Sequence, residues 1–428
     1  MDYSREVEVL VRTYLVDTVG VTFAGAEEIR DKAFAILSLQ KSKGTSKPIG
    51  FHTECSLSDA LFINGLSAHF LELDDGVRYG VVHPSAPLFS ALIPIAMENK
   101  VSWTDFLRGT VCGYEISISI ASAMQPHHYN AGYHPTATCC TLGVAVGVAV
   151  MLGWNDQMVK DAFSAACISA CGSLKVLEDV SQLKPYNCAK AALNGYMSAI
   201  MAKAGFVGPS DPLGGDTGFL KMMASDYNEV ILTEERDYLY LEKIYQKPYA
   251  SCRHTHPEIE ACFNIRKATG FAFDQIDHVK VTTYKGVVGK HDFKDVHGES
   301  SARMSIPYSV AIALATGKAG IAEFAAPYVS DKSILNLTQK VDIVPSEELS
   351  KLVPDKRVAI VEVVMKDGTV LSDKVEYPKG EPENPLTADE NLAKFISMIT
   401  HAGMTEEKAK AIFNELTMAQ EPDFNILW

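Results

Sequence analysis

Apolar residues recur every three or four positions from Ser4 to about Tyr240, which is the spacing typical of buried amphipathic helices. The pattern then changes. Residues 276–284 alternate between apolar and polar side chains like a strand, and residues 357–365, followed by a turn at Asp367-Gly368, indicate a hairpin. Helical spacing returns after residue 385. The pattern therefore predicts a mainly α protein with an α+β second domain.

Caps and glycines separate the expected elements. The first helices are expected near residues 4–20, 26–41, 58–74, 86–99, 103–124, 136–153, 156–174, 188–205 and 216–224, with later ones near 257–269, 307–316 and 319–325. A capping box at Thr387 and Glu390 begins helices that run to about Met418. We expect a helical domain at 1–242, an α+β domain at 243–385, and C-terminal helices at 386–428 that rejoin the helical domain.

Composition narrows the class of protein. The chain has 428 residues, of which 47% are hydrophobic, enough for two domains with a large core. A net charge of −14 argues against nucleic acid and anionic membranes as partners. The N-terminus lacks the apolar stretch of a signal peptide, and the apolar run at 142–152 is too short to span a bilayer. Nine cysteines without a Cys-x-x-Cys pair indicate reduced thiols in a cytoplasmic protein, with no iron–sulfur cluster.

Two carboxylates follow the third expected helix. If that helix spans about 58–73 and stops at Gly76, Asp74 and Asp75 lie at its C-terminal end, where each opposes the helix dipole at a cost of about 0.3–1 kcal/mol. Such a cost suggests a function. The alternative is that both are solvated loop residues.

Histidine precedes proline at three expected helix starts, at His83, His134 and His256. Proline suits the first position of a helix, so each histidine is placed beside free backbone donors that favour anions. Each could also be an ordinary cap. Three such sites, with Tyr308 at the start of another apolar helix, indicate a shared anion-binding cleft.

Other chemistries have less support. His127, His128 and His134 lie close in sequence, but no carboxylate or His-Glu-x-x-His pattern accompanies them, so no metal site is expected. No Gly-x-Ser-x-Gly or nucleotide-binding sequence is present, and no cofactor is expected. Lys184 and Lys190 could each hold a substrate carboxylate, or could be solvated surface lysines.

These segments resemble the MmgE/PrpD family, which includes 2-methylcitrate dehydratase, cis-aconitate decarboxylase and iminodisuccinate epimerase. The matching motifs run through nearly the whole chain: residues 64–69, 72–75, 83–85, 132–136, 141–143, 247–253 with His256, and 307–308. The resemblance implies a helical domain built from both ends of the chain, an α+β lid domain, and assembly as a homodimer.

The resemblance also implies site residues. His83, His134 and Tyr308 fall on active-site positions of the decarboxylase, and the cluster of Glu72, Asp74 and Asp75 covers its carboxylate position. This chain departs from that pattern in three ways. Gly76 stands where the decarboxylase has a threonine, the acidic residue most directly matched is Glu72 rather than an aspartate, and the loop from Asp75 to His83 is one residue longer.

All three family activities begin at a carbon beside a carboxylate. They need an acid and a base, a donor for the developing negative charge, and cations for the carboxylates. We assign His83 and His134 as acid/base candidates, Asp75 as an orienting group or base, and Tyr308 as a donor. Candidate substrate-binding residues are Glu72, Asp74, Lys184, Lys190, Arg253 and His256.

The sequence therefore predicts a cofactor-independent lyase, a dehydratase or decarboxylase, acting on a small di- or tricarboxylate. An epimerase or racemase of an iminodisuccinate-like dicarboxylate is the alternative. A non-catalytic carboxylate-binding protein is the second alternative, although binding alone would not need two histidines and a tyrosine.

Overall fold

The computed structural model describes residues 3–177 and 181–428, and their contacts divide the chain into two compact units. The first, called the helical unit, combines residues 3–177 with Leu183–Gln246 and Thr387–Trp428. The second, called the α+β unit, holds Lys247–Leu386. The protein is thus mainly α with an α+β second unit, as its sequence pattern predicts.

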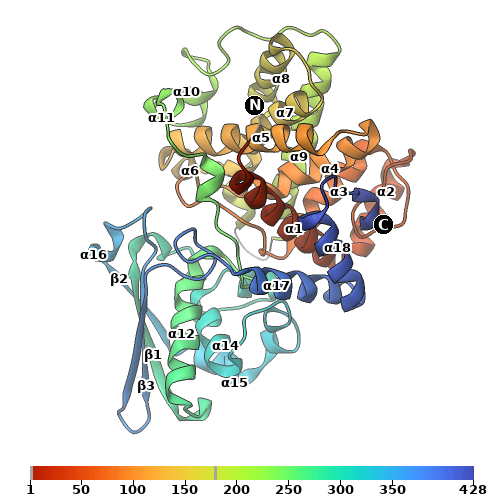
Figure 1. The fold of residues 1–428 in the computed structure, drawn as a ribbon. Helices are drawn as coiled ribbons and strands as arrows, with labels where there is room; N and C mark the ends of the chain where they lie inside the picture. The colour runs from red at the N-terminus through yellow and green to blue at the C-terminus, as the bar shows by residue number, and fades with distance from the viewer. Residues whose placement is uncertain (1–2, 178–180) are drawn as a thin grey trace. The chain divides into compact units, whose positions relative to one another are not determined.

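Long helices dominate the helical unit (Figure 1). They are α1 (Arg5–Glu28), α2 (Arg30–Gln40), α3 (Leu57–Phe70), α4 (Ser85–Asn99), α5 (Trp103–Ala123), α7 (Pro135–Met151), α8 (Asp156–Ser169), α9 (Lys184–Lys203), α17 (Ala388–His401) and α18 (Glu406–Met418). Shorter helical segments are α6 (His127–Asn130), η1 (Leu174–Leu177), α10 (Phe219–Met223), α11 (Val230–Thr233), η2 (Tyr240–Lys243) and η8 (Phe424–Leu427).

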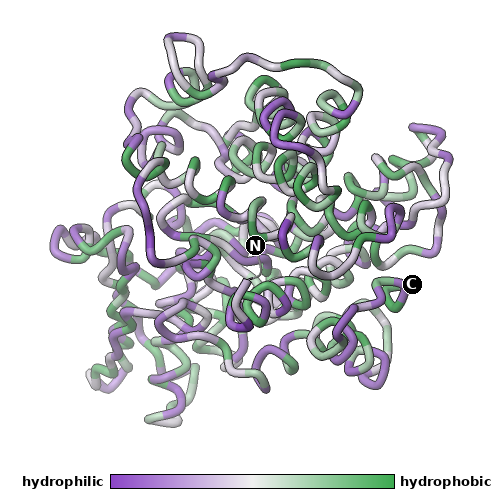
Figure 2. The backbone as a smooth tube through the Cα atoms, turned by 45° about the horizontal axis from the view of Figure 1, so that its top comes forward, coloured by the Kyte–Doolittle hydropathy of each residue, from purple (hydrophilic) through white to green (hydrophobic). Residues whose placement is uncertain are grey.

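The core of this unit is built around α7, which packs against α4, α5, α8 and α9. All but one of its 17 residues are buried, and small residues allow neighbouring helices to approach closely. A Cβ at Gly143 would overlap the Ser117 side chain of α5 and the backbone carbonyl of Gly113. Figure 2 shows the hydrophobic stretches concentrated in helical turns, whereas many connecting segments are hydrophilic.

Helix α1 lies in the core of the same unit. Among the described residues it is the one helix long and apolar enough to cross a membrane, but 83% of its most apolar window is buried. It contacts α3, α17 and α18, so the C-terminal helices pack on the N-terminal helix. The predicted capping box is present, because Thr387 accepts from the Glu390 amide while the Glu390 carboxylate accepts from the Thr387 amide.

The α+β unit contains four strands and several short helices. The strands are β1 (Ile276–Tyr284), β2 (Val341–Ser346), β3 (Ala359–Met365) and β4 (Val370–Val375). The helices are η3 (Arg253–Thr255), α12 (His256–Thr269), η4 (Phe273–Gln275), η5 (Lys285–Val287), α13 (Glu299–Ala302), α14 (Ile306–Thr316), η6 (Ala322–Phe324), η7 (Tyr328–Ser330), α15 (Lys332–Thr338) and α16 (Glu347–Ser350).

The strands form one mixed sheet in the order β2-β1-β3-β4. β1 pairs in parallel with β2 and antiparallel with β3, and β3 and β4 form the predicted hairpin. α12 packs on β3 and β4, and α14 packs on α12 (Figure 1). Along β3, buried apolar residues alternate with half-buried residues. The buried ones contribute to the core of this unit.

Two expectations about elements were wrong, and one strand was missed. The segment near 319–325 forms only the 3₁₀ turn η6 rather than a full helix. Strand β2 was not predicted at all. The third expected helix ends at Phe70, several residues before Gly76.

Candidate active site

The acidic segment after α3 leaves the helix through an unusual backbone conformation. Glu72 has a φ of 56°, in the left-handed region that non-glycine residues rarely occupy. Strain of this kind persists only where the surroundings impose it, and it gathers at functional sites. The segment is held further along, because Gly76 exchanges backbone hydrogen bonds with Tyr245 at 3.1 and 2.8 Å.

Gly76 also has a steric reason to be glycine. A Cβ there would overlap the phenol ring of Tyr245. The threonine expected at this position from the decarboxylase could not be accommodated without moving that tyrosine. The position of the Tyr245 ring therefore explains why this chain has glycine rather than threonine at position 76.

His83 and His134 stand at helix starts, as their sequence context predicts. His134 is the N-cap residue of α7, and His83 lies two residues before α4. The His83 amide donates to the Thr136 hydroxyl in the first turn of α7 at 3.0 Å, which ties the two starts together. The centres of the two imidazole rings are 6.5 Å apart. The structure thus brings together two candidates that are about fifty residues apart in sequence.

The imidazole of His69, which was not among the site residues predicted from the sequence, lies beside these two histidines. His69, in the last turn of α3, is completely buried, and its ring centre lies 5.0 Å from that of His83 and 6.0 Å from that of His134. Its Nδ1 is 2.6 Å from Oδ2 of Asp74, which is also completely buried. The sequence feature that could have indicated this contact is a histidine followed five residues later by a carboxylate, where a helix passes into a loop. We call His69, His83 and His134 the histidine cluster.

Hydrogen bonds define which nitrogens can accept a proton. His83 Nδ1 lies 2.6 Å from the backbone carbonyl of Asp75. A carbonyl only accepts, so Nδ1 carries the hydrogen and Nε2 carries the lone pair. By the same reasoning, Asp74 assigns the hydrogen of His69 to Nδ1. His69 Nε2 and His134 Nδ1 are buried without a hydrogen-bond partner among the residues that the structure describes.

The two aspartates differ in their contacts. Asp74, predicted to bind substrate, lies 2.6 Å from His69 Nδ1 and 3.7 Å from His83 Nδ1, so its carboxylate is the one that faces the histidines. The Asp75 side chain instead accepts hydrogen bonds from the amide and hydroxyl of Ser85, and only its backbone carbonyl meets His83. Burial raises the pKa of Asp75 to about 8. This carboxyl is therefore mostly protonated near pH 7.

Lys184 supplies a cation beside the cluster. Its Nζ lies 2.5 Å from both carboxylate oxygens of Glu72, and the two side chains are only 13% and 9% exposed. Lys184 begins α9 and so comes from a different segment than the acidic one. The Glu72 and Lys184 candidates are brought together as a close ion pair.

The surroundings favour neutral His134. Burial, followed by the positive charge of Lys184 and the neighbouring histidines, lowers the pKa of His134 well below its usual range. A neutral imidazole has both a donor and an acceptor nitrogen, and its conjugate acid gives up its proton readily. The cluster thus combines proton-accepting nitrogens with a carboxylate and an ammonium group.

The remaining candidates have other partners among the described residues. Lys190 contacts Cys171 and the ring of Tyr186 rather than the histidine cluster. In the α+β unit, the Tyr308 hydroxyl donates to the backbone carbonyl of Glu323 at 2.9 Å. Arg253 is paired with Glu381 and also donates to His256 Nδ1 and to the backbone carbonyls of residues 378 and 379.

His256 is completely buried, and its Nε2 lies 3.2 Å from the backbone carbonyl of Ser251. Because Arg253 donates to Nδ1, the hydrogen of His256 is on Nε2. These contacts give Arg253, His256 and Tyr308 structural partners inside the α+β unit. Their predicted roles toward substrate stay predictions.

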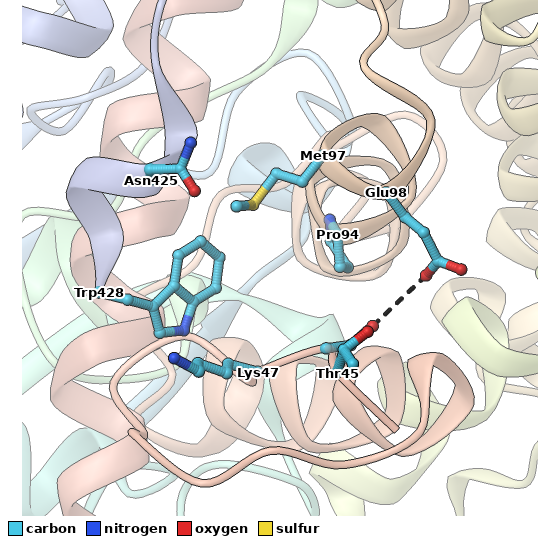
Figure 3. Close-up of a pocket in the computed structure, with 8 residues that line it drawn as sticks. Thr45, Lys47, Pro94, Met97, Glu98, Asn425 and Trp428 are labelled. Carbon is cyan, nitrogen blue, oxygen red and sulfur yellow. Dashed lines mark hydrogen bonds between the residues drawn. The ribbon is translucent and has the colours of Figure 1, made fainter. Parts of the chain in front are cut away.

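A separate pocket of about 260 Å³ lies near the C-terminus of the helical unit (Figure 3). It is lined by Thr45, Ser46, Lys47, Pro94, Met97, Glu98, Asn425 and Trp428. Ser46 donates to Glu98, and the Trp428 indole donates to the Pro48 carbonyl. None of its lining residues belongs to the histidine cluster, so this pocket is not the candidate reaction centre.

A lysine of the C-terminal helices forms a buried ion pair and also contacts the segment that carries Glu72, Asp74 and Asp75. Lys394 of α17 lies 2.6 Å from Asp17 of α1 and donates to the Leu73 carbonyl at 3.1 Å. Replacing Lys394 by methionine would leave the Asp17 carboxyl buried without its cation. We expect the free energy of unfolding, measured with urea, to fall by about 3–5 kcal/mol.

The matched control is Lys410→Met, which breaks an exposed pair with Glu406 on α18. Exposed pairs contribute little, so that variant should unfold close to wild type. Equal urea midpoints and slopes for the two variants would show that the Lys394 pair does not stabilise the fold.

Comparison with known proteins agrees with this architecture. Residues 2–230 match the model of the MmgE/PrpD N-terminal domain, and residues 249–418 match that of the C-terminal domain. The chain therefore belongs to the MmgE/PrpD family. This family and the relatives described next support a lyase of the dehydratase or decarboxylase kind.

Two relatives show how low the sequence identity within the family can be. The chain is 25% identical to the cis-aconitate decarboxylase-like protein oryM of Aspergillus oryzae over 378 residues, covering 82% of this chain and 78% of that protein. It is 22% identical to a cis-aconitate decarboxylase of Aspergillus terreus over 416 residues, covering 89% of this chain and 82% of that protein.

Proposed function

We propose that this chain is a cofactor-independent lyase that acts on a small di- or tricarboxylate at the carbon beside a carboxylate group. The observation that carries the proposal is the histidine cluster, in which three imidazoles gather next to Asp74 and the Glu72–Lys184 pair. Proton transfer by positioned imidazoles is an effective form of catalysis near neutral pH.

The contacts suggest separate roles for the two sequence-predicted histidines. His83 Nε2 takes the proton from the substrate carbon, and the bond's electron pair moves toward the adjacent carboxylate. Asp74, 3.7 Å from His83 Nδ1, stabilises the imidazolium that forms. In a dehydration, His134 first takes a proton from solvent, and this ready donor then gives it to the departing hydroxide, while His83 later returns its proton to water. In a decarboxylation no carbon proton is removed: the bond pair of the departing carbon dioxide stays on carbon, and protonated His134 delivers one proton to that carbon.

Lys184 holds a substrate carboxylate in this proposal, exchanging part of its contact with Glu72 for one with the substrate. Asp75 is a buried support for Ser85 and the start of α4 rather than a base. Assembly as a homodimer and a cytoplasmic location stay predictions from the sequence, as does the absence of nucleic acid and membrane partners.

An epimerase is the second candidate, favoured by one observation. His83 and His134 come from different helix starts, and their ring centres lie 6.5 Å apart, which supplies the two separate proton carriers that two-base epimerisation needs. One histidine would remove the proton from one face of the carbon, and the other would deliver a proton to the opposite face.

Proton exchange followed by product analysis tests these proposals. The purified chain, after exhaustive chelation, is incubated in D2O with a panel of small di- and tricarboxylates and followed by NMR. We expect deuterium at the carbon beside a carboxylate for at least one acid, together with a new alkene or released carbon dioxide. Inverted stereochemistry without fragment loss would select the epimerase.

Saturable binding of an acid without exchange or product would indicate the non-catalytic carboxylate-binding protein. If activity is lost on chelation and restored by added iron or zinc, the cofactor-independent mechanism is wrong.

A further inference from the structure

A second group of chemically reactive side chains lies within the α+β unit. Cys252 and His254 flank the first residue of η3, just before α12, and His291 follows η5 beyond the end of β1. One potential ligand atom from each residue lies within 4.8 Å of the others. The fold thus brings a thiol and two imidazoles from two separate segments to one point.

This combination of groups matches the preferences of zinc-class ions. Zinc binds cysteine sulfur at about 2.3 Å and histidine nitrogen at about 2.0–2.1 Å, which separates neighbouring ligand atoms in a tetrahedral site by about 3.3–3.6 Å. Ligand atoms within 4.8 Å need only small side-chain rotations to reach that spacing. Three protein ligands also leave one position for a water or another oxygen ligand.

The histidines have the outer contacts that metal-binding imidazoles use. His291 Nδ1 lies 2.9 Å from the Met304 carbonyl, so it carries the hydrogen and leaves the lone pair on Nε2. His254 Nδ1 hydrogen-bonds the hydroxyl of Tyr284, the last residue of β1. Such contacts fix the tautomer and the ring orientation of a ligating histidine. The two rings stack with centres 4.9 Å apart.

The backbone at the cysteine is also fixed. The Cys252 amide donates to the Arg303 carbonyl at 2.8 Å, and the Cys252 carbonyl accepts from the Thr255 amide at 2.9 Å. His254 is partly exposed, whereas His291 is buried. One ligand therefore lies on the solvent side of the group, and the inner ligand is held by the fold.

From this geometry we propose that Cys252, His254 and His291 form a binding site for a divalent zinc-class metal ion. Its three ligands all belong to the α+β unit, and none of them is a member of the histidine cluster. It was not predicted from the sequence, where the only histidines weighed as metal ligands were His127, His128 and His134.

Cobalt(II) is the probe, because its spectrum reports both coordination number and sulfur ligation. The full-length chain is treated with a chelator, exchanged into buffer and titrated with Co²⁺. We expect saturation at one ion per chain, visible bands typical of tetrahedral cobalt, and a near-ultraviolet thiolate-to-cobalt charge-transfer band. Added Zn²⁺ should bleach these bands by displacement.

Variants then assign the ligands. Cys252→Ser should abolish the charge-transfer band, and His291→Gln should weaken binding by at least about 100-fold. Tyr284→Phe removes only an outer contact, so it should weaken binding by about 10–100-fold and keep the charge-transfer band. The last variant preserves all three ligands and tests the site even if a ligand variant fails to fold.

Cys171→Ser and His278→Gln are the matched controls, since both residues are exposed and outside the group. They should bind Co²⁺ like wild type. The proposal is overturned if wild type shows no saturable binding or no charge-transfer band. It is also overturned if folded Cys252→Ser keeps the band, or if Cys171→Ser loses it. These readouts do not involve turnover, so they are separate from the test of the proposed lyase.

Discussion

Glutamine in place of His83 or His134 is expected to preserve the fold and to lower turnover by about 10²–10⁴-fold, the range for loss of a positioned acid or base. Glutamine keeps a donor and an acceptor of similar reach, but it cannot carry a proton. The measurement is kcat on the acid identified by proton exchange, with circular dichroism and thermal unfolding of each variant to establish that it is folded.

His278→Gln is the control, because that exposed histidine contacts only its neighbour Asp277 among the described ion pairs. It should turn over like wild type. A folded His134→Gln enzyme with nearly unchanged kcat would exclude His134 as an essential proton carrier. A variant that unfolds would show instead that the imidazole serves packing.

Methionine in place of Lys184 should have the next largest effect. The change keeps the apolar stem but removes the charge that meets Glu72 at 2.5 Å. A hydrogen bond to a charged group contributes about 1.5–3 kcal/mol, so loss of a carboxylate clamp should lower kcat/KM by about 10–150-fold. Steady-state kinetics on the same acid measures this change.

Two further variants separate substrate binding from a purely structural ion pair. Lys190→Met, in the same helix but outside the cluster, should leave kcat/KM unchanged. If Lys184 serves only to neutralise Glu72, the double variant Lys184→Met/Glu72→Gln will recover wild-type kcat/KM. If Lys184 holds the substrate, as we propose, the double variant will stay impaired.

Strong periodic patterns predicted most of the fold. β1 was predicted with the bounds that the structure has, and the hairpin of β3 and β4 was recognised from alternation around Asp367-Gly368. β2 was missed because its six residues include Pro345 and are mostly exposed or half-buried, so no alternation marks them. Its strand character comes from parallel pairing with β1, a long-range contact that local sequence does not encode.

The site was predicted in part for a similar reason. His-Pro at a helix start is a local signal, and it located His83 and His134 correctly at the starts of α4 and α7. His69 has no such signal, because it lies inside an apolar helix. Only the turn that brings the Asp74 carboxylate to its imidazole marks His69 as a candidate. The contact of Asp74, rather than Asp75, with the imidazoles also depends on that turn.

Other local signals led to candidates whose polar side chains have partners within the protein. Arg253, His256 and Tyr308 stand at helix starts, but their polar atoms meet acceptors and donors within the α+β unit. Burial of a polar group requires such partners, so a histidine or tyrosine beside a helix start is equally compatible with structural bonding. Sequence alone does not distinguish the two.

The histidine cluster is proposed to move a proton at the carbon beside a substrate carboxylate. The rate of deuterium incorporation at that carbon, measured by NMR in D2O for wild type, His83→Gln and His134→Gln under identical conditions, tests this proposal. We expect exchange in wild type and a loss of about 10²-fold or more in at least the His83 variant, which lacks the proposed base. Wild-type exchange rates in both folded variants would contradict it.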